Sequence, residues 1–302
     1  MKIKTFGYKE SAGGYLEILE SEWKSMGHEI VLHDDDSSDY DCIFNIDRSQ
    51  LDKAHEESKK SDKPFHCLVL DIPIMEGTEF EWKLCKKELI ETEKEIYKDC
   101  TTLLSISEET SRVVKKHMGF DSDCVGIASL SSERDYDKRD RYPYIYYFGR
   151  ALDPVKNIAT VVAALSGTGL ELYISGEYCP PEYFKSIAPD VKIRNFGWID
   201  RKDVNTLIKH AHLLVGPELY TGLGMQPIEG ILMGTPCINA DIPIKREVWG
   251  EVLPLYEPKN VDDCRQKIMD FRNEDVNMEE AIKIAEWYLP ERVAQRILDS
   301  FK

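Results

Sequence analysis

Short apolar runs alternate along the whole chain with longer segments of helical periodicity. Apolar residues recur at helical spacing within Tyr15–Met26, as at Leu16 and Leu19, and this spacing predicts a helix. Strands are expected over Lys2–Phe6, Glu29–His33, Tyr40–Asn45, Phe65–Leu70, Thr101–Ser105, Tyr144–Phe148, Leu170–Ser175, Val191–Arg194, His212–Val215 and Pro236–Asn239. Further helices are expected over Glu79–Asp99, Glu108–Met118, Ile158–Leu165, Asp203–His210 and Met225–Met233.

Strands separated by helices indicate βαβ units and parallel sheets, and two such runs predict two doubly wound, Rossmann-like domains. The polar stretch Ser131–Tyr142 lacks hydrophobic periodicity and is interpreted as the linker. The predicted domains are therefore residues 1–142 and 143–302. Doubly wound sheets bind ligands at the carboxyl ends of their strands, so we expect the functional residues in the loops after strands, bordering a cleft between the domains.

The composition narrows the function classes. The chain has 302 residues and a formal net charge of −16, with 55 acidic and 39 basic residues. Two domains fit this length. Proteins that bind nucleic acids generally carry a basic surface, so the acidic balance argues against nucleic acid as a partner. It also disfavours an anionic membrane surface, although it leaves room for peripheral membrane contact through a local basic patch.

No targeting or membrane-spanning segment is expected. The first residues are charged and lack the apolar core of a signal peptide, and no run approaches 18 apolar residues. The eight cysteines show no CxxC spacing, and several lie inside apolar runs, so they are interpreted as reduced thiols. These features predict a cytoplasmic protein.

Two loops after predicted strands have residues suited to phosphate. Gly13 and Gly14 precede the first helix, where backbone N–H groups and a helix N-terminus favour an anion, although a ligand-free tight turn is the alternative. In the second half, Gly149 ends a strand, and Arg150 and Lys156 flank the loop that leads into the next helix. Two cations beside a helix N-terminus suit a diphosphate, and a solvated pair of surface cations is the alternative.

A third candidate lies within Pro217–Pro236. Gly222 and Gly224 form a glycine-rich turn, and the helix predicted to begin near Met225 directs its N-terminus at that turn. Glu229 falls one turn into this helix, where a carboxylate can accept hydrogen bonds from two ribose hydroxyls. The alternative is an acidic residue that only favours the helix dipole.

These motifs resemble the donor-binding domain of family 4 glycosyltransferases. The resemblance rests on FGR followed by Lys156-Asn157, on the loop at Phe196-Gly197-Trp198, and on the stretch PELYTGLGMQPIEGILMGTP. It is specific over residues 147–240 and loose before residue 100, and in the N-terminal half GGYLEILESEWKSMGHEI and LSISEET carry it. The resemblance implies a retaining enzyme of GT-B architecture, in which the last helix, about residues 286–302, crosses back to the N-terminal domain.

The resemblance also assigns roles to residues. It implies that Arg150 and Lys156 bind the donor diphosphate and that Glu229 holds the ribose. The remaining implied donor contacts are Gly14, Gly149, Gly197, Thr221, Gly222, Leu223 and Gly224. At Thr221 the family usually has a glutamate that contacts the donor sugar, and Glu218 lies three residues earlier. At Leu70-Asp71 the family often has His-Asp, so Asp71 alone is retained beside the reacting sugar.

The predicted function is transfer of a hexose from a UDP-sugar or GDP-sugar to a hydroxyl of an unidentified sugar, glycan or lipid acceptor, without a metal or other cofactor. The run Asp34-Asp35-Asp36 is interpreted as a solvated loop rather than a metal site. Two alternatives stay open. One is a non-catalytic nucleotide-sugar-binding relative, and the other is an epimerase, hydrolase or phosphorylase of the same architecture.

Overall fold

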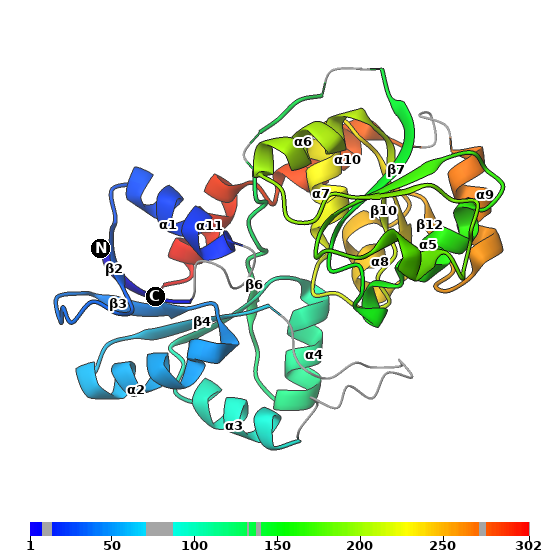
Figure 1. Ribbon diagram of the computed structural model, residues 1–302. Coiled ribbons are helices and arrows are strands. Elements are labelled where there is room, and N and C mark those ends of the chain that lie inside the picture. The colour runs from blue at the N-terminus through cyan, green and yellow to red at the C-terminus, as the bar shows by residue number, and fades with distance from the viewer. Residues whose placement is uncertain (8–13, 71–86, 132, 137–139, 272–275, 302) are drawn as a thin grey trace. The chain divides into compact units, whose positions relative to one another are not determined.

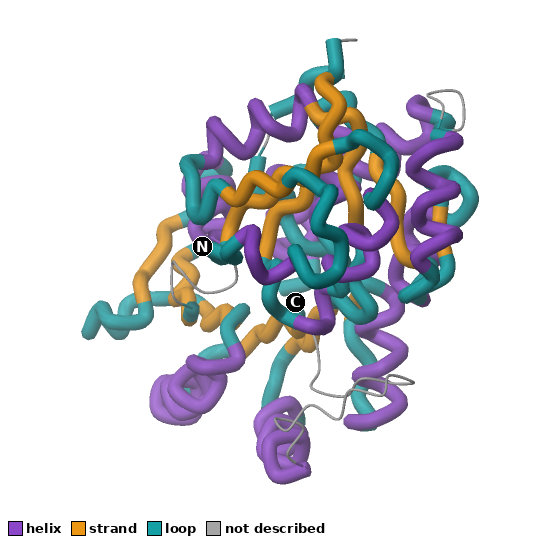
Figure 2. Tube along the Cα trace, turned by 45° about the vertical axis from the view of Figure 1, so that its right-hand side comes forward, coloured by secondary structure: helices purple, strands orange, loops and turns teal. Residues whose placement is uncertain are grey.

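A computed structural model of the chain describes two compact α/β units (Figure 1). It describes residues 1–7, 14–70, 87–131, 133–136, 140–271 and 276–301. The first unit comprises Met1–Ser132 together with Trp287–Lys302, and the second comprises Glu133–Glu286. Strands and helices alternate in both units (Figure 2), as the hydrophobic pattern predicts.

The first unit contains a six-stranded parallel sheet with the order β2-β1-β3-β4-β5-β6. Its strands are β1 (Lys2–Phe6), β2 (Glu29–Leu32), β3 (Cys42–Asn45), β4 (Phe65–Val69), β5 (Thr102–Ser105) and β6 (Asp123–Cys124). Its helices are α1 (Tyr15–Ser25), α2 (Leu51–Ser61), α3 (Lys87–Tyr97), α4 (Glu108–Met118) and α11 (Pro290–Asp299), with a 3₁₀ turn η2 (Arg48–Gln50). β3 and β4 are buried along their whole length, as expected for central strands covered on both faces.

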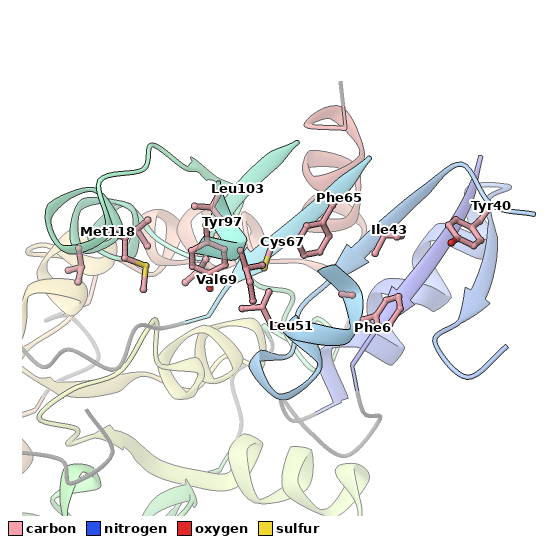
Figure 3. Packing of buried hydrophobic residues seen from close by; sticks show 14 residues of the cluster. Phe6, Tyr40, Ile43, Leu51, Phe65, Cys67, Val69, Tyr97, Leu103 and Met118 are labelled. Carbon is pink, nitrogen blue, oxygen red and sulfur yellow. The ribbon is translucent and has the colours of Figure 1, made fainter. Parts of the chain in front are cut away.

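Helices cover both faces of this sheet (Figure 1). α2, α3 and α4 supply one face, where the side chains of Leu51, Tyr97 and Met118 pack with Cys67 and Val69 of β4 in one buried cluster (Figure 3). α1 and α11 pack against each other over the other face. The alternation of side chains along each strand sends successive residues into these two layers.

Trp23 connects α11 to the core of the first unit. Its ring is fully buried and meets Phe44 of β3 edge to face at 5.2 Å. Its indole Nε1 donates a hydrogen bond to the backbone oxygen of Ala294 in α11 at 3.1 Å. The last helix is therefore part of the core of the first unit.

Trp23→Ala is expected to destabilise the protein by about 3–5 kcal/mol, because it opens a large cavity between α1, β3 and α11. Trp198→Ala is the matched control, since Trp198 is 81% exposed and its loss should change stability by less than about 0.5 kcal/mol. Urea unfolding followed by circular dichroism measures both. Equal losses in the two variants would contradict this description of the core.

The second unit contains a six-stranded parallel sheet with the order β12-β11-β10-β7-β8-β9. Its strands are β7 (Tyr142–Gly149), β8 (Glu171–Gly176), β9 (Ile193–Asn195), β10 (Ala211–Gly216), β11 (Cys237–Ala240) and β12 (Leu255–Tyr256). Its helices are α5 (Ile158–Leu165), α6 (Arg201–His210), α7 (Met225–Leu232), α8 (Pro243–Trp249), α9 (Val261–Asp270) and α10 (Met278–Glu286), with 3₁₀ turns η3 (Pro154–Lys156) and η4 (Pro181–Phe184). The strand order reverses between β7 and β10, so the crevice at their carboxyl ends is where this kind of sheet binds ligands.

The segment interpreted as a linker is partly attached to the second unit. The backbone N–H of Asp135 donates to Leu232 O at 2.9 Å, and the Arg141 guanidinium donates to Gly234 O at 2.9 Å. Lys209 of α6 also pairs with the carboxylate of Asp135 at 3.1 Å. Because these bonds fix the segment to α6 and to the end of α7, the unit begins before the predicted boundary at 142.

Candidate functional site

The carboxyl ends of β7 and β8 approach each other through two glycines. Gly149 of β7 is paired in register with Gly176 of β8. A Cβ atom on Gly176 would lie 2.6 Å from the backbone oxygen of Gly149, and one on Gly149 would lie 2.9 Å from the hydroxyl of Tyr147. Both glycines have positive φ angles, so neither position accepts another residue without strain. Gly149 was among the predicted donor contacts, whereas the matching requirement at Gly176 was not predicted.

The loop after β7 carries the two predicted cations. Arg150 Nη2 lies 3.1 Å from a carboxylate oxygen of Asp153, and the Arg150 side chain is largely exposed. Asp153 also caps η3, because its Oδ1 accepts a hydrogen bond from the backbone N–H of Val155 at 3.1 Å. Lys156 ends η3 and is half-buried. Asp153 therefore fixes the loop from which both cations extend.

This loop is attached to the segment that follows β10. The backbone N–H of Leu219 donates to Val155 O at 2.8 Å, and the Asn157 side-chain amide donates to Pro217 O at 3.3 Å. Asn157 adopts a left-handed backbone conformation, with a φ angle of 51°, to begin α5. The cation loop and the glycine-rich stretch, which are some 60 residues apart in sequence, are thereby brought together within the second unit.

Lys156 lies in an electrostatic environment that disfavours its charged form. Burial is the main cause of a pKa below the ordinary lysine value of 10.5, and the nearby positive charges of Arg150 and Lys245 lower it further. The carboxylates of Glu218 and Asp153 act in the opposite direction. A bound anion would restore the charge on Lys156, which is the behaviour expected of a phosphate-binding lysine.

The glycine-rich turn leads directly into α7. Gly224 precedes the helix with a φ angle of 79°, which favours glycine, and the residues of α7 are all buried. Thr221 and Gly222 are half-buried, whereas Leu223 is buried. Gln226 Nε2 donates to the backbone oxygen of Phe148 at 3.0 Å, so the first turn of α7 is held against the end of β7. The N-terminus of α7 thus lies at the same sheet edge as the cation loop.

Glu229 is fully buried in α7 and has a partner that sequence reasoning missed. Arg201, in the first turn of α6, donates from Nη2 to Glu229 Oε2 at 2.5 Å. The Arg201 side chain is 31% exposed, so this pair extends from the interior to the surface. The spacing of Arg201 and Glu229 in the sequence gives no signal for their pairing. A charged residue in the first turn of a helix, such as Arg201, is ordinarily interpreted as solvated.

The loop after β9 presents aromatic side chains around Gly197. The backbone N–H of Gly197 donates to Asn195 Oδ1 at 2.8 Å, and its carbonyl accepts from the backbone N–H of Gly176 at 2.8 Å. Phe196 and Trp198 on either side are exposed. The structure therefore places Gly149, Gly176 and Gly197 along neighbouring carboxyl ends of β7, β8 and β9.

The other two predicted site residues are Gly14 and Asp71. Gly14 lies in the first unit, where it precedes α1 in a left-handed conformation with a φ angle of 84°. Asp71 lies outside the described residues. Within the part of the chain that the structure describes, no three His, Cys, Asp or Glu side chains gather in a group that could hold a metal ion. The same part contains no helix long and apolar enough to cross a membrane.

Comparisons with known proteins agree with this geometry. The family model "Glycosyl transferases group 1" matches residues 131–286, which is more than half of the chain. The protein therefore belongs to this family and is a nucleotide-sugar glycosyltransferase. Membership in family 4 stays a prediction. No curated protein sequence matches the chain.

Solved structures of glycosyltransferases share the fold over the whole chain. Anabaena HepE in complex with UDP and glucose has a TM-score of 0.76 and 14% identity, covering 99% of this chain and 98% of HepE. Sucrose-phosphate synthase from Thermosynechococcus elongatus has a TM-score of 0.76 and 13% identity, covering 100% and 95%. The lipopolysaccharide outer core galactosyltransferase WaaB in its apo form has a TM-score of 0.69 and 16% identity, covering 99% of each chain. The predicted fold class, two Rossmann-like units of GT-B type, is confirmed.

Proposed function

We propose that this protein is a retaining, metal-independent transferase that moves a hexose from a UDP-sugar to a hydroxyl acceptor. The observation that carries the proposal is the convergence of Arg150, Lys156 and the N-terminus of α7 at the strand-order reversal of the second sheet. UDP is chosen because it is bound in complexes of HepE and of Staphylococcus aureus TarM, both of which share this fold.

The two cations suit the departing nucleotide. During transfer, negative charge develops on the β-phosphate oxygen as its bond to the sugar breaks. Arg150 and Lys156 are fixed near this position by η3, so they stabilise that charge without a large rearrangement. The N–H groups at the start of α7 add a partial positive charge. These groups supply the positive charge that a divalent cation supplies in other phosphoryl sites, which is the basis for proposing metal independence.

Glu229 suits the ribose. Its carboxylate is buried in α7 and oriented by Arg201, so it can accept hydrogen bonds from ribose hydroxyls in a dry environment. The exposed rings of Phe196 and Trp198, beside Gly197, offer a surface on which a base can stack. Gly149, Gly222, Leu223 and Gly224 then contribute backbone contacts to the phosphate and sugar. The net charge of −16 supports a function without a nucleic-acid partner, and a cytoplasmic location stays a prediction.

Thr221 occupies the position at which the family resemblance implies a glutamate against the donor sugar. Its side chain supplies one hydroxyl rather than a charge, which still permits one hydrogen bond to a sugar hydroxyl. Asp71 and Gly14 are proposed to act from the first unit, Asp71 beside the reacting sugar and Gly14 beside the phosphate. The acceptor is proposed to be a sugar, a glycan or a lipid that carries a free hydroxyl.

The anomeric configuration of the product tests this proposal. Wild-type enzyme incubated with an α-linked UDP-hexose and an acceptor mixture should yield an α-linked product by ¹H NMR, at the same rate with and without EDTA. The expected result rests on same-face transfer, in which the departing phosphate helps to deprotonate the acceptor. A β-linked product would overturn retention, and loss of turnover in EDTA would overturn metal independence.

A further inference from the structure

Lys245 of α8 is a fully buried lysine next to the proposed donor site. Its side chain is 0% exposed, a rare state for a lysine. Its Nζ lies 3.7 Å from Glu218 Oε2, and the Glu218 side chain is 1% exposed. Among the described residues, neither Lys245 Nζ nor either carboxylate oxygen of Glu218 has a hydrogen-bond partner. The two charges therefore neutralise each other across a gap, buried at the end of β10.

The ammonium group fills the space left by Gly224. A Cβ atom on Gly224 would lie 2.1 Å from Lys245 Nζ and 2.9 Å from its Cε, whereas one on Gly216 would first meet Asn239 Oδ1, at 2.3 Å. Gly224 is the last residue before α7, so the ammonium lies directly against the backbone that opens this helix. Lys245 and the absence of a side chain at Gly224 are thus parts of one arrangement.

Lys245 is close enough to Lys156 for the two positive charges to interact. The positive charge of Lys245, like that of Arg150, lowers the pKa of Lys156. Glu218 opposes this effect at Lys156. In a dry interior such interactions extend further than in water, because solvent does not screen them.

A packing role alone does not account for a charge at residue 245. Methionine fills a similar volume without desolvation, whereas burying an ion carries a desolvation cost that pairing offsets only with good geometry and further hydrogen bonds. Buried ion pairs are therefore weak sources of stability. The cost of this pair makes a functional contribution of the charge to the adjoining site the better explanation.

We propose that Lys245 is a positioning residue of the donor site: held by Glu218, its ammonium fixes the turn Gly222–Gly224 and makes its backbone a better receptor for the terminal phosphate of a nucleoside diphosphate. This inference rests on the proposed function. It assigns part of the discrimination between nucleoside diphosphate and monophosphate to a residue that does not touch the ligand.

The ratio of the dissociation constants for UMP and UDP tests the proposal. Lys245→Met should lower this ratio about tenfold, because the turn Gly222–Gly224 loses the ammonium that fixes it against the second phosphate, while uridine affinity stays unchanged. Isothermal titration on the full chain measures all three ligands. Lys192→Met is the control for a change in net charge, since Lys192 lies in the same unit with an 81% exposed side chain, and it should keep the wild-type ratio.

The double variant Glu218→Gln/Lys245→Met separates the effect of Lys245 on phosphate discrimination from its effect on stability. Breaking the pair in either single variant should lower the melting temperature, whereas removing both charges should recover most of the loss. The phosphate discrimination should stay low in the double variant, because the ammonium is absent. A ratio that recovers with the melting temperature, or an unchanged ratio in Lys245→Met, would overturn the proposal. If wild-type protein bound no nucleoside diphosphate at all, the proposed function itself would fail instead.

Discussion

Lys156→Met is expected to reduce kcat/KM for the nucleotide sugar by about 10- to 150-fold. The lysine supplies a charge-assisted hydrogen bond to the diphosphate, worth about 1.5–3 kcal/mol, and each 1.4 kcal/mol corresponds to about a factor of ten. Methionine keeps the buried part of the side chain, so the fold should be retained. The loss should fall largely on kcat, because the charge on the phosphate is greatest in the transition state.

Lys185→Met is the matched control for this variant. Lys185 belongs to the same unit, and its side chain is 65% exposed and paired with Glu182. It should retain wild-type kinetics, since a surface pair contributes little. Equal losses in the two variants would show that Lys156 acts only through net charge. Wild-type kinetics in Lys156→Met would place the diphosphate elsewhere.

The pH dependence of binding follows from the lowered pKa of Lys156. The amine is charged below its pKa in the free enzyme and becomes neutral as the pH rises through it. Because burial places this pKa below the ordinary 10.5, affinity for UDP should fall with rising pH earlier than an exposed lysine would cause. Binding of the diphosphate should raise the pKa again, so proton uptake should accompany binding. Lys156→Arg should flatten the pH profile, because a guanidinium stays charged.

Glu229→Gln is expected to have the second large effect, a loss of UDP affinity of at least tenfold together with lower stability. The variant removes the acceptor proposed for the ribose hydroxyls and leaves Arg201 without its counter-charge. Loss of one partner of a charged, partly buried hydrogen bond costs about 1–3 kcal/mol. Titration with UDP and chemical unfolding measure the two consequences separately.

The double variant Arg201→Gln/Glu229→Gln separates binding from folding. Two neutral amides in place of the ion pair should recover part of the lost stability, since no uncompensated charge remains. UDP affinity should stay as low as in Glu229→Gln, because the carboxylate is still absent. Affinity that returned with stability would contradict the assignment of Glu229 to the ribose.

The sequence was sufficient to predict the layout of the fold where hydrophobic periodicity is strong. The strands that became β3, β4, β7 and β10 are mostly apolar, because both faces of a parallel sheet are buried. α2 was not predicted, because only Leu51 and Ala54 of its residues are fully buried and the remainder is polar. The elements after Ala240 were also missed, except for the last helix, which the family resemblance implied.

The candidate site was predictable only in part, for a physical reason. Gly149, Arg150, Lys156 and the turn at Gly222–Gly224 are recognisable, because they lie in loops that follow predicted strands, where doubly wound sheets bind ligands. Their convergence in the second unit is a property of the sheet order, which places the ends of β7 and β10 side by side.

Arg201 and Lys245 could not be identified from sequence, because their functions depend on distant partners. Arg201 of α6 pairs with Glu229 of α7, and Lys245 of α8 pairs with Glu218, which lies between β10 and α7. In a sequence both cations are typical of exposed helical positions. Only the folded structure shows that one is partly buried and the other entirely so.

Thermal melting with a panel of nucleoside diphosphates tests the central claim most directly, which is that the second unit contains a nucleotide-sugar donor site. The full chain is melted with millimolar UDP, GDP, ADP or dTDP. A ligand present at 100 times its dissociation constant stabilises the folded state by about 2.7 kcal/mol. We predict a clear upward shift with UDP that Glu229→Gln reduces. No shift with any of the four would contradict the donor site.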